Sequence, residues 1–473
     1  MGSIKKNFLY NAAYQVLTLC IPLITTPHLS RALGADGIGV YSYAQSSAHL
    51  FTIFIMLGLS NYGCREIAKK QENIEKLSET FWSIYFLQLT LGVLVNGLYA
   101  GYCLFFARDH VAAWLLGLYT LAASLDITWF YFGLEKFRFM TGINFFIRLS
   151  QTLLIVVLVH DEADVYLYCL IMAGGLLLSQ LILWLDIWKR VHFYLPKFKE
   201  VTVHLKPNML LLTTSIAVSM FKQMDKIMLG TMSSVTQVGF YESAERVLTV
   251  PTSLISALGA VMLPRMSNLL SLKGQETEKY LHTSILFAMF ISSSMSFGIM
   301  GISKEFVPLF YGEGYEICVY LYLILLPTCI FLAFANVIRT QYLLPHQMDL
   351  SYVISAILGA AVNLLVNAVL IIPLGAIGVS IGTFVAELVV CLYQSAKVMQ
   401  RVSLSKYIYE SLPLILSGGI MFVILYFWSI PHMPDVVVIA LKIVVGVLVY
   451  FVSLILVSVV FKINYVRILK TTI

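Results

Sequence analysis

The sequence has little charge and none of the short motifs that mark a nucleotide motor or a hydrolase. Only 12% of its 473 residues are Asp, Glu, Lys or Arg, whereas about 25% is usual for a soluble domain. No segment matches GxxxxGK[ST], HExxH or GxSxG, and the nine histidines show no metal-ligand spacing. We therefore expect no P-loop ATPase, no enzyme, no metal, no cofactor and no nucleic-acid partner.

The sequence also lacks cysteine pairs and a cleavable signal peptide. The seven cysteines form no CxxC motif, and nearly all lie within apolar segments, where cysteine acts as a small hydrophobic side chain. The apolar stretch after Lys5 and Lys6 is long, is interrupted by polar residues and has no A-x-A-like cleavage site. We expect this stretch to be the first membrane helix.

Apolar residues are abundant, at 59% of the chain, and the mean hydropathy is +0.85. A membrane-spanning helix needs about 20 apolar residues, and about 14 segments meet that length. They lie near 8–28, 38–60, 81–106, 111–133, 142–160, 164–188, 209–230, 244–264, 283–303, 317–339, 351–373, 377–397, 411–430 and 437–461. The chain is therefore predicted to be an all-α, polytopic membrane protein.

Basic residues are distributed unequally between the two ends of these segments. When the N-terminus is placed in the cytoplasm, 23 Lys and Arg residues fall at cytoplasmic ends. Only three fall on the opposite side, namely Arg31, Arg108 and Lys304, together with the acidic loop 160–164. Cytoplasmic loops are enriched in Lys and Arg, so we predict that both termini are cytoplasmic.

Two parts of the chain resemble each other at an offset of 200 residues. The segment 39–44, GVYSYA, is similar to the segment 239–244, GFYESA, and Arg65 corresponds to Arg265. Six predicted helices separate the copies, and an even number preserves their direction, which indicates parallel repeats about an axis along the membrane normal. We expect two six-helix lobes, 1–206 and 207–400, related by this pseudo-two-fold axis and followed by a terminal helix pair, 401–473.

Three charged residues, Lys222, Asp225 and Lys226, lie in the outer half of the predicted span 209–230. A charge costs about 2.5–3.5 kcal/mol at the centre of a membrane helix and is retained where it is paired or hydrated. Lys222 and Lys226 share a helix face at a spacing of four. A charged face of this kind predicts a functional site.

Further charges gather near the outer ends of neighbouring spans. Arg31 follows the first span, and Glu242, Glu245 and Arg246 lie at the start of the eighth. If the lobes meet there, Arg31 pairs with Asp225, Glu242 or Glu245 and forms an outer gate. The alternative is static pairing within one lobe, as between Lys222 and Asp225 or between Glu242 and Arg246, and the sequence leaves both open.

Arg148 lies near the middle of the predicted span 142–160, with Gln151 one turn further on and no acidic residue within a turn. Because nothing on its own helix neutralises this charge, we expect Arg148 to line a hydrated cavity. Asn11 and Gln15 share a face of the first span and could line the same space. The candidate substrate-binding residues are Arg148, Gln151, Lys222, Lys226, Asn11 and Gln15.

Two acidic residues stand alone in predicted spans. These are Asp126 in the fourth and Glu387 in the twelfth. Each is either an ion-coupling site or a structural partner, and we favour the structural role.

Several motifs together resemble one family of transporters. The segment 129–138, WFYFGLEKFR, resembles the W-x-x-x-G-x-E-k turn of bacterial polysaccharide exporters, and similar matches occur at 5–7, 31–34, 39–41, 225–230 and 261–265. The chain is accordingly similar to the Wzx-like oligosaccharide flippases. Their superfamily also contains multidrug and toxin extruders and the peptidoglycan precursor flippase.

The resemblance implies a substrate, a location and partners. The substrate would be an undecaprenyl-diphosphate-linked oligosaccharide repeat unit of a capsule, an O-antigen or a similar glycan. The protein would move it by alternating access from the inner to the outer leaflet of the bacterial cytoplasmic membrane. Partners would be membrane lipids and the glycan polymerase and glycosyltransferases of the pathway. A multidrug-type cation antiporter and a peptidoglycan precursor flippase remain alternatives; the antiporter would need an acidic cavity. A membrane enzyme would need a sizeable extracytoplasmic loop, which the sequence lacks.

Overall fold

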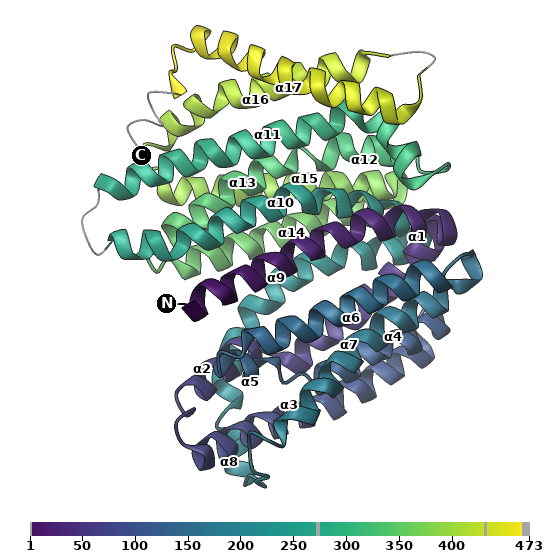
Figure 1. The fold of residues 1–473 in the computed structure, drawn as a ribbon, viewed down its shortest axis with the longest axis vertical. Helices are drawn as coiled ribbons and strands as arrows, with labels where there is room; N and C mark the ends of the chain where they lie inside the picture. The colour runs from purple at the N-terminus through teal and green to yellow at the C-terminus, as the bar shows by residue number, and fades with distance from the viewer. Residues whose placement is uncertain (1, 271–274, 430–432, 466–473) are drawn as a thin grey trace. The chain divides into compact units, whose positions relative to one another are not determined.

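A computed structural model gives the fold of the chain (Figure 1). It describes the backbone of residues 2–270, 275–429 and 433–465, and the side chains within those ranges apart from 2–20, 210–222, 269–270 and 275–277. Every regular element in these ranges is helical, which confirms the expected all-α class. The chain divides into two compact units, residues 1–239 and 240–473.

The first unit is built around its N-terminal helix, which contacts α3, α4, α6, α7 and α9. The helices of this unit are α1 (Gly2–Met56), α2 (Leu59–Ala68), α3 (Ile74–Phe105), α4 (His110–Ser124), α5 (Thr128–Gly133), α6 (Phe137–Leu158), α7 (Val165–Ile187), α8 (Phe198–Thr202), α9 (Leu205–Met232) and the start of α10. The predicted lobe boundaries at 206 and 400 differ from the division after residue 239, which groups α9 with the helices before it. The symmetry between lobes stays a prediction.

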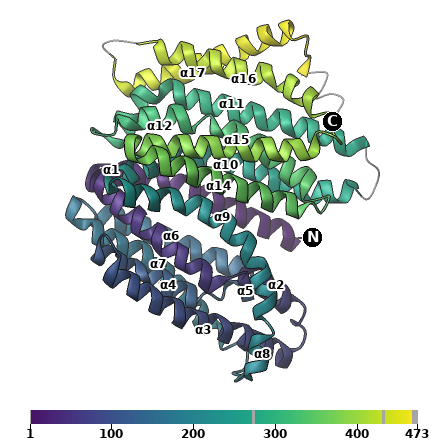
Figure 2. The same cartoon turned by 180° about the vertical axis from the view of Figure 1, so that it is seen from behind.

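The second unit contains the remaining helices. They are α10 (Val235–Leu270), α11 (Gln275–Tyr311), α12 (Ile317–Leu325), α13 (Thr328–Ile338), a π-helical turn (Arg339–Leu343), α14 (Asp349–Leu374), α15 (Ala376–Val398), α16 (Leu404–Phe427) and α17 (Asp435–Val460). α14 packs along α15, and α16 packs against both α11 and α17. The α16–α17 pair is seen side by side from the front and from behind (Figures 1 and 2).

Eleven helical segments of the described residues are long and apolar enough to cross a bilayer. They coincide with eleven of the expected spans. The other three expected spans are 8–28, 38–60 and 209–230. The first and the last fall on α1 and α9, where many side chains lie outside the described set. The span 38–60 falls on the second part of α1, whose side chains are described, and is not among the eleven. The chain is therefore a multi-span membrane protein.

α1 consists of two helices joined by a sharp turn at Gly34. The backbone of Gly34 has a φ of 62° and a ψ of −176°, a conformation that side chains disfavour. The helical run continues through Pro22 and Pro27. Glycine, and not proline, therefore sets the direction in which the chain returns after residue 34.

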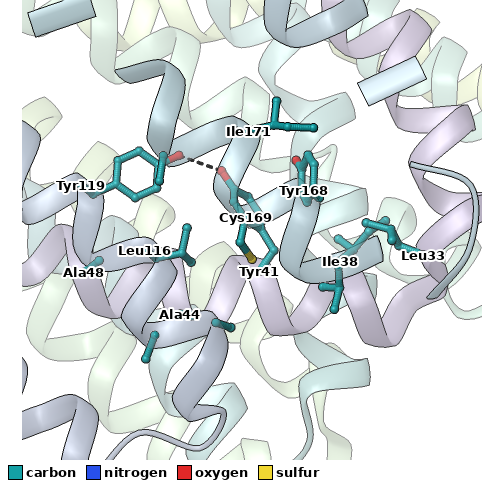
Figure 3. Close-up of a cluster of buried hydrophobic side chains, with 14 of the residues drawn as sticks. Leu33, Ile38, Tyr41, Ala44, Ala48, Leu116, Tyr119, Tyr168, Cys169 and Ile171 are labelled. Carbon is teal, nitrogen blue, oxygen red and sulfur yellow. Dashed lines mark hydrogen bonds between the residues drawn. The ribbon is translucent and has the colours of Figure 1, made fainter. Parts of the chain in front are cut away.

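The core of the first unit lies where the second part of α1 packs against α4 and α7 (Figure 3). The hydroxyls of Tyr41 and Tyr119 are hydrogen-bonded at 3.0 Å, and the rings of Tyr41 and Tyr168 lie 4.5 Å apart. Ala44 and Ala48 are buried beside them. Such small residues let membrane helices approach closely.

A second core forms around the segment that carries the W-x-x-x-G-x-E-k motif. Trp129 is buried and donates from its indole Nε1 to Gln88 Oε1 at 3.0 Å. A Cβ atom on Gly63 would lie 2.6 Å from the Trp129 ring, and one on Gly133 would lie 2.7 Å from the Ile67 Cβ. The tryptophan and the glycine of the motif thus pack the short helix α5 directly against α2.

Candidate functional site

A cavity of about 280 Å³ lies among four helices of the first unit. α1 and α4 supply one part of its wall, and α6 and α7 supply the other. Its lining residues are Gln45, His49, Tyr119, Asn144, Ile147, Arg148, Gln151, Met172, Leu176 and Ser179. Among the described residues of this lining, Arg148 alone has a permanent charge and none is acidic.

The wall formed by α1 and α4 is a hydrogen-bonded polar surface. Gln45 donates from Nε2 to the Tyr119 hydroxyl at 3.3 Å, and the ring of His49 lies 5.2 Å from that of Tyr119. Tyr119 is itself hydrogen-bonded to Tyr41 of the core (Figure 3). Gln45 and His49 are four residues apart and therefore share one face of α1.

The opposite wall holds Arg148. Asn144, Arg148 and Gln151 follow one another on α6 at spacings of four and three, which puts them on one face. Asn144 Oδ1 accepts a hydrogen bond from Ser179 Oγ at 2.9 Å. Gln151, only 7% exposed, donates from Nε2 to the carbonyls of Ile171 and Met172 at 3.1 and 3.0 Å.

Arg148 forms no ion pair with any acidic side chain in the described parts of the chain. Its own helix and the cavity lining supply no carboxylate, so its charge is available to an anionic ligand in the cavity. The structure therefore brings Arg148 and Gln151 together in one cavity; their role in binding stays a prediction.

The charges of α9 lie near the same cavity in part. Lys226 lies close enough to His49, a lining residue, for an electrostatic interaction between their side chains. Asp225 is buried, with 4% of its surface exposed. The other predicted cavity residues, Asn11, Gln15 and Lys222, have side chains that lie outside the described residues. No statement about their surroundings follows from the structure.

Two kinds of pairing were considered for the outer charges, a gate pair that involves Arg31 and static pairs within one lobe. The structure contains one ion pair of the static kind, within a single helix. Arg246 Nε donates to Glu242 Oε1 at 2.9 Å on α10. Arg31, at the end of the first part of α1, donates from Nη1 to the carbonyl of Pro27 at 3.0 Å. Pairing of Arg31 with Asp225, Glu242 or Glu245 stays a prediction.

The two isolated acids occupy different settings. Asp126 Oδ1 accepts hydrogen bonds from the backbone N–H and hydroxyl of Thr128 at 2.8 and 2.6 Å, which shapes the turn that begins α5. Glu387 is buried on α15 and lies close enough to Cys329 and Cys391 for electrostatic interactions with their thiols. The choice between an ion-coupling role and a structural role stays a prediction for both acids.

The repeated corners at 34–39 and 234–239 contact each other within the first unit. Thr236 donates a hydrogen bond from Oγ1 to Asp36 Oδ1. A Cβ atom on Gly39 would collide with the carbonyl oxygen of Val235, and one on Gly239 would collide with that of Ala35. Gly39 and Gly239, the first residues of the two similar segments, therefore pack reciprocally against residues just before the other segment, a relationship that the sequence offset suggests only indirectly.

Two charged residues of structural importance escaped the sequence analysis. Lys442 on α17 is fully buried and donates from Nζ to Glu305 Oε1 of α11 at 2.6 Å. Its only signal in the sequence is a lone lysine within an apolar span, and a buried charge in a membrane helix requires a partner.

The sequence profile of the family described as "Polysaccharide biosynthesis protein" matches residues 4–270, more than half of the chain. The chain belongs to this family. It is a Wzx-like oligosaccharide flippase, a membrane transporter and not an enzyme, as the motifs around Trp129 suggested.

Relatives and solved structures agree with this assignment. The flippase is 23% identical over 406 residues to an Escherichia coli (strain K12) protein named for O-antigen transport, covering 84% of this chain and 96% of the relative. It is 24% identical over 189 residues to a Haloferax volcanii protein named for low-salt glycan biosynthesis, Agl15, covering 40% of each.

Three-dimensional comparison shows the fold that the flippase shares. Its structure is similar to the lipid II flippase MurJ, with a TM-score of 0.61, 14% identity and coverage of 96% of this chain and 99% of the other. An inward-facing multidrug transporter of the MATE family matches with a TM-score of 0.60, 14% identity and coverage of 79% and 94%. These likenesses place the flippase in the fold of the multidrug, oligosaccharidyl-lipid and polysaccharide transporters.

Proposed function

We propose that this flippase moves an undecaprenyl-diphosphate-linked oligosaccharide repeat unit from the inner to the outer leaflet of the bacterial cytoplasmic membrane by alternating access. The observation that carries the proposal is the polar cavity around Arg148, whose described lining residues include a cation and no acid. The diphosphate linker is anionic, and an unpaired charge inside the membrane is strongly unfavourable. Arg148 offsets that cost while the lipid tail stays in the bilayer.

The polar residues beside Arg148 suit the sugar part of such a substrate. Gln45, Asn144 and Ser179 offer amide and hydroxyl groups, and Tyr119 offers an aromatic ring beside them. A carrier of cationic drugs would instead use an acidic cavity to attract its substrate. The composition of the lining therefore supports the glycan carrier over the antiporter, in spite of the fold shared with multidrug transporters.

The gating element in this proposal is the outer corner of each repeat. We infer two six-helix lobes, 1–206 and 207–400, that rock on each other, with the helix pair 401–473 beside them and both termini in the cytoplasm. Arg31 would pair with Asp225, Glu242 or Glu245 when the outer side is closed. The reciprocal contact of Gly39 and Gly239 supports a closure at these corners.

The proposal is tested in the host by deleting the gene and complementing it with variants. We expect loss of surface polysaccharide and accumulation of complete lipid-linked repeat units in the inner leaflet. An Arg148→Ala variant that inserts normally should fail to restore the glycan, whereas Arg401→Ala, at an exposed basic residue of the second unit, should restore it. Intact glycan in the deletion strain, with new sensitivity to cationic drugs, would refute the proposal.

A further inference from the structure

A second hollow lies on the first unit, where α6 begins. It has a volume of about 730 Å³ and is bounded by the first half of α6 and the end of α7. Its polar end is lined by Glu135, Lys136, Arg138 and Arg190. Its apolar side is lined by Phe139, Ile143, Phe146, Ile147 and Ile182, with Gly142 between them. We refer to these residues as the α6 groove.

The polar end of the α6 groove is basic. Lys136 and Arg138 are exposed, and Lys136 has no ion pair among the described residues. Arg190 is paired with Asp186, and Glu135 contributes one acid to the rim. The polar end thus carries three basic side chains and one acidic side chain, and Lys136 and Arg138 are its exposed cations. It lies at the membrane end that we predict to be cytoplasmic.

The backbone holds Lys136 at this position. Glu135 adopts a φ of 57°, in the left-handed region, and the N–H of Lys136 donates to the carbonyl of Tyr131 at 2.9 Å. Helix α6 starts at the next residue without a side-chain cap. The tight turn after α5 thus places Lys136 at the start of the helix, beside the groove.

The apolar side of the α6 groove indicates that its ligand is a lipid phosphate and not a soluble anion. Phe139, Ile143 and Phe146 follow one another at spacings of four and three, and therefore share one face of α6. Phe146 is 68% exposed on a helix that crosses the membrane. A free phosphate would use only the basic end, whereas a lipid phosphate would use the basic end and this face together.

The α6 groove leads toward the Arg148 cavity. Ile147 lines both, and α7 continues from Ile182 in the groove to Ser179 in the cavity. Arg138 and Arg148 are ten residues apart on α6, which corresponds to about 15 Å along the helix axis. A phosphate held at the groove would therefore have a second cation about three turns deeper.

We propose that the α6 groove is the loading site for the phosphate of a polyprenyl-linked lipid in the cytoplasmic leaflet, with Lys136 and Arg138 as the headgroup-binding residues and Phe139, Ile143 and Phe146 as the contact for the isoprenoid chain. This inference rests on the proposed function, because it identifies the first binding position of the same substrate. Arg148 would then form the second binding position.

The test uses the full-length protein in phosphatidylcholine nanodiscs and a photoreactive polyprenyl diphosphate as the probe. Labelling should fall on the α6 groove, within residues 135–147 or at Ile182 and Arg190. Because each basic residue near a membrane surface contributes about fivefold to the affinity for an anionic lipid, Lys136→Ala and Arg138→Ala should each weaken the probe's apparent affinity by about fivefold. Lys70→Ala, at an exposed lysine of the same unit outside the groove, should leave it unchanged.

Three results would overturn the assignment. The first is labelling confined to residues outside the α6 groove and the Arg148 cavity. The second is unchanged affinity in the Lys136→Ala/Arg138→Ala double variant. The third is complete displacement of the probe by an equal amount of phosphatidylglycerol, which would show a general site for anionic lipids. Thermal melting of each variant, and rescue by Lys136→Arg, exclude misfolding as the cause of weak binding.

The Arg148→Ala variant separates this inference from the proposed function. It should still be labelled at the α6 groove while failing to restore surface glycan in the deletion strain. If deletion leaves the glycan intact, the proposed function fails and the labelling result still decides whether the groove binds a lipid phosphate.

Discussion

Gly39 and Gly239 occupy equivalent positions in the two copies of the repeat, and each packs against the backbone of the other copy. The contact is reciprocal, because Gly39 faces the carbonyl of Val235 and Gly239 faces that of Ala35. The hydrogen bond from Thr236 to Asp36 joins the same corners. This reciprocal contact is compatible with the two-fold relationship that we predict between the repeats, which stays a prediction.

Gly239→Ala should destabilise this contact. The atom that an added methyl group would meet is a backbone oxygen, which cannot rotate away as a flexible side chain can. Overpacking of this kind costs about 1–3 kcal/mol, so the unfolding midpoint in detergent should fall. Gly39→Ala should have a similar effect, because its contact is the reciprocal one.

The matched control for both variants is Gly101→Ala. No atom lies within 4 Å of a Cβ built on Gly101, which also lies within a helix. This variant should be as stable as the wild type or slightly more stable, since alanine is the better helix former. Equal losses at Gly101 and Gly239 would show that the reciprocal contact has no special effect on stability.

Gly133→Ala should disrupt the packing of the W-x-x-x-G-x-E-k segment. The new methyl group would lie 2.7 Å from the Ile67 Cβ and 2.8 Å from the Cys64 carbonyl oxygen, so α5 must move away from α2. We expect a loss of about 1–3 kcal/mol in stability, measured by denaturant unfolding monitored through tryptophan fluorescence. Gly142→Ala, inside α6 and with nothing within 4 Å, is the control and should leave the stability unchanged or slightly raise it.

Much of the fold could be predicted from hydropathy alone. Membrane helices must bury their own backbone hydrogen bonds and be apolar over a bilayer's thickness, so spans such as 317–339 and 437–461 coincide with helical segments. The sharp turn at Gly34 was not predicted as such. It depends on one residue's backbone conformation, which an apolar window does not report.

The candidate site was predicted only in part. Arg148 stood out because it is a charge within an apolar span, and Gln151 because it is one turn away. His49 and Ser179 were missed because they are common polar residues on other helices, and their closeness to Arg148 depends on how α1, α6 and α7 pack. One signal was available in the sequence: Asn144 lies one turn before Arg148 on the same face.

Lys442→Ala should destabilise the second unit more than most substitutions. It would leave Glu305, whose side chain is 17% exposed, without the cation that it contacts at 2.6 Å. Removing one partner of a buried ion pair typically costs about 3–5 kcal/mol. The measurement is the thermal midpoint in nanodiscs, where Lys442→Ala should melt well below the wild type.

The double variant Lys442→Met/Glu305→Gln tests the reason for that loss. It removes both charges and keeps similar volumes, and replacement of a whole buried pair by neutral groups is often close to neutral. We therefore expect it to recover most of the stability lost in Lys442→Ala. A double variant as unstable as the single one would show that packing, and not an unpaired carboxylate, accounts for the effect.

The loop before α9 should become less stable as the pH falls below about 6.5. The Tyr62 hydroxyl and His204 Nδ1 are hydrogen-bonded at 2.7 Å, with neutral His204 as the acceptor. Burial lowers the pKa of His204 from its ordinary value. The unfolded segment therefore binds more protons than the folded one between the two pKa values, so the free energy of local unfolding decreases as the pH is lowered through this window. Hydrogen exchange of residues 200–208 between pH 7.5 and 5.5 measures this effect. The rates are corrected for intrinsic exchange and compared with those of a His204→Gln variant at the same pH values. Protection should decrease in the wild type and stay constant in His204→Gln; an equal decrease in both would assign the pH response to another group.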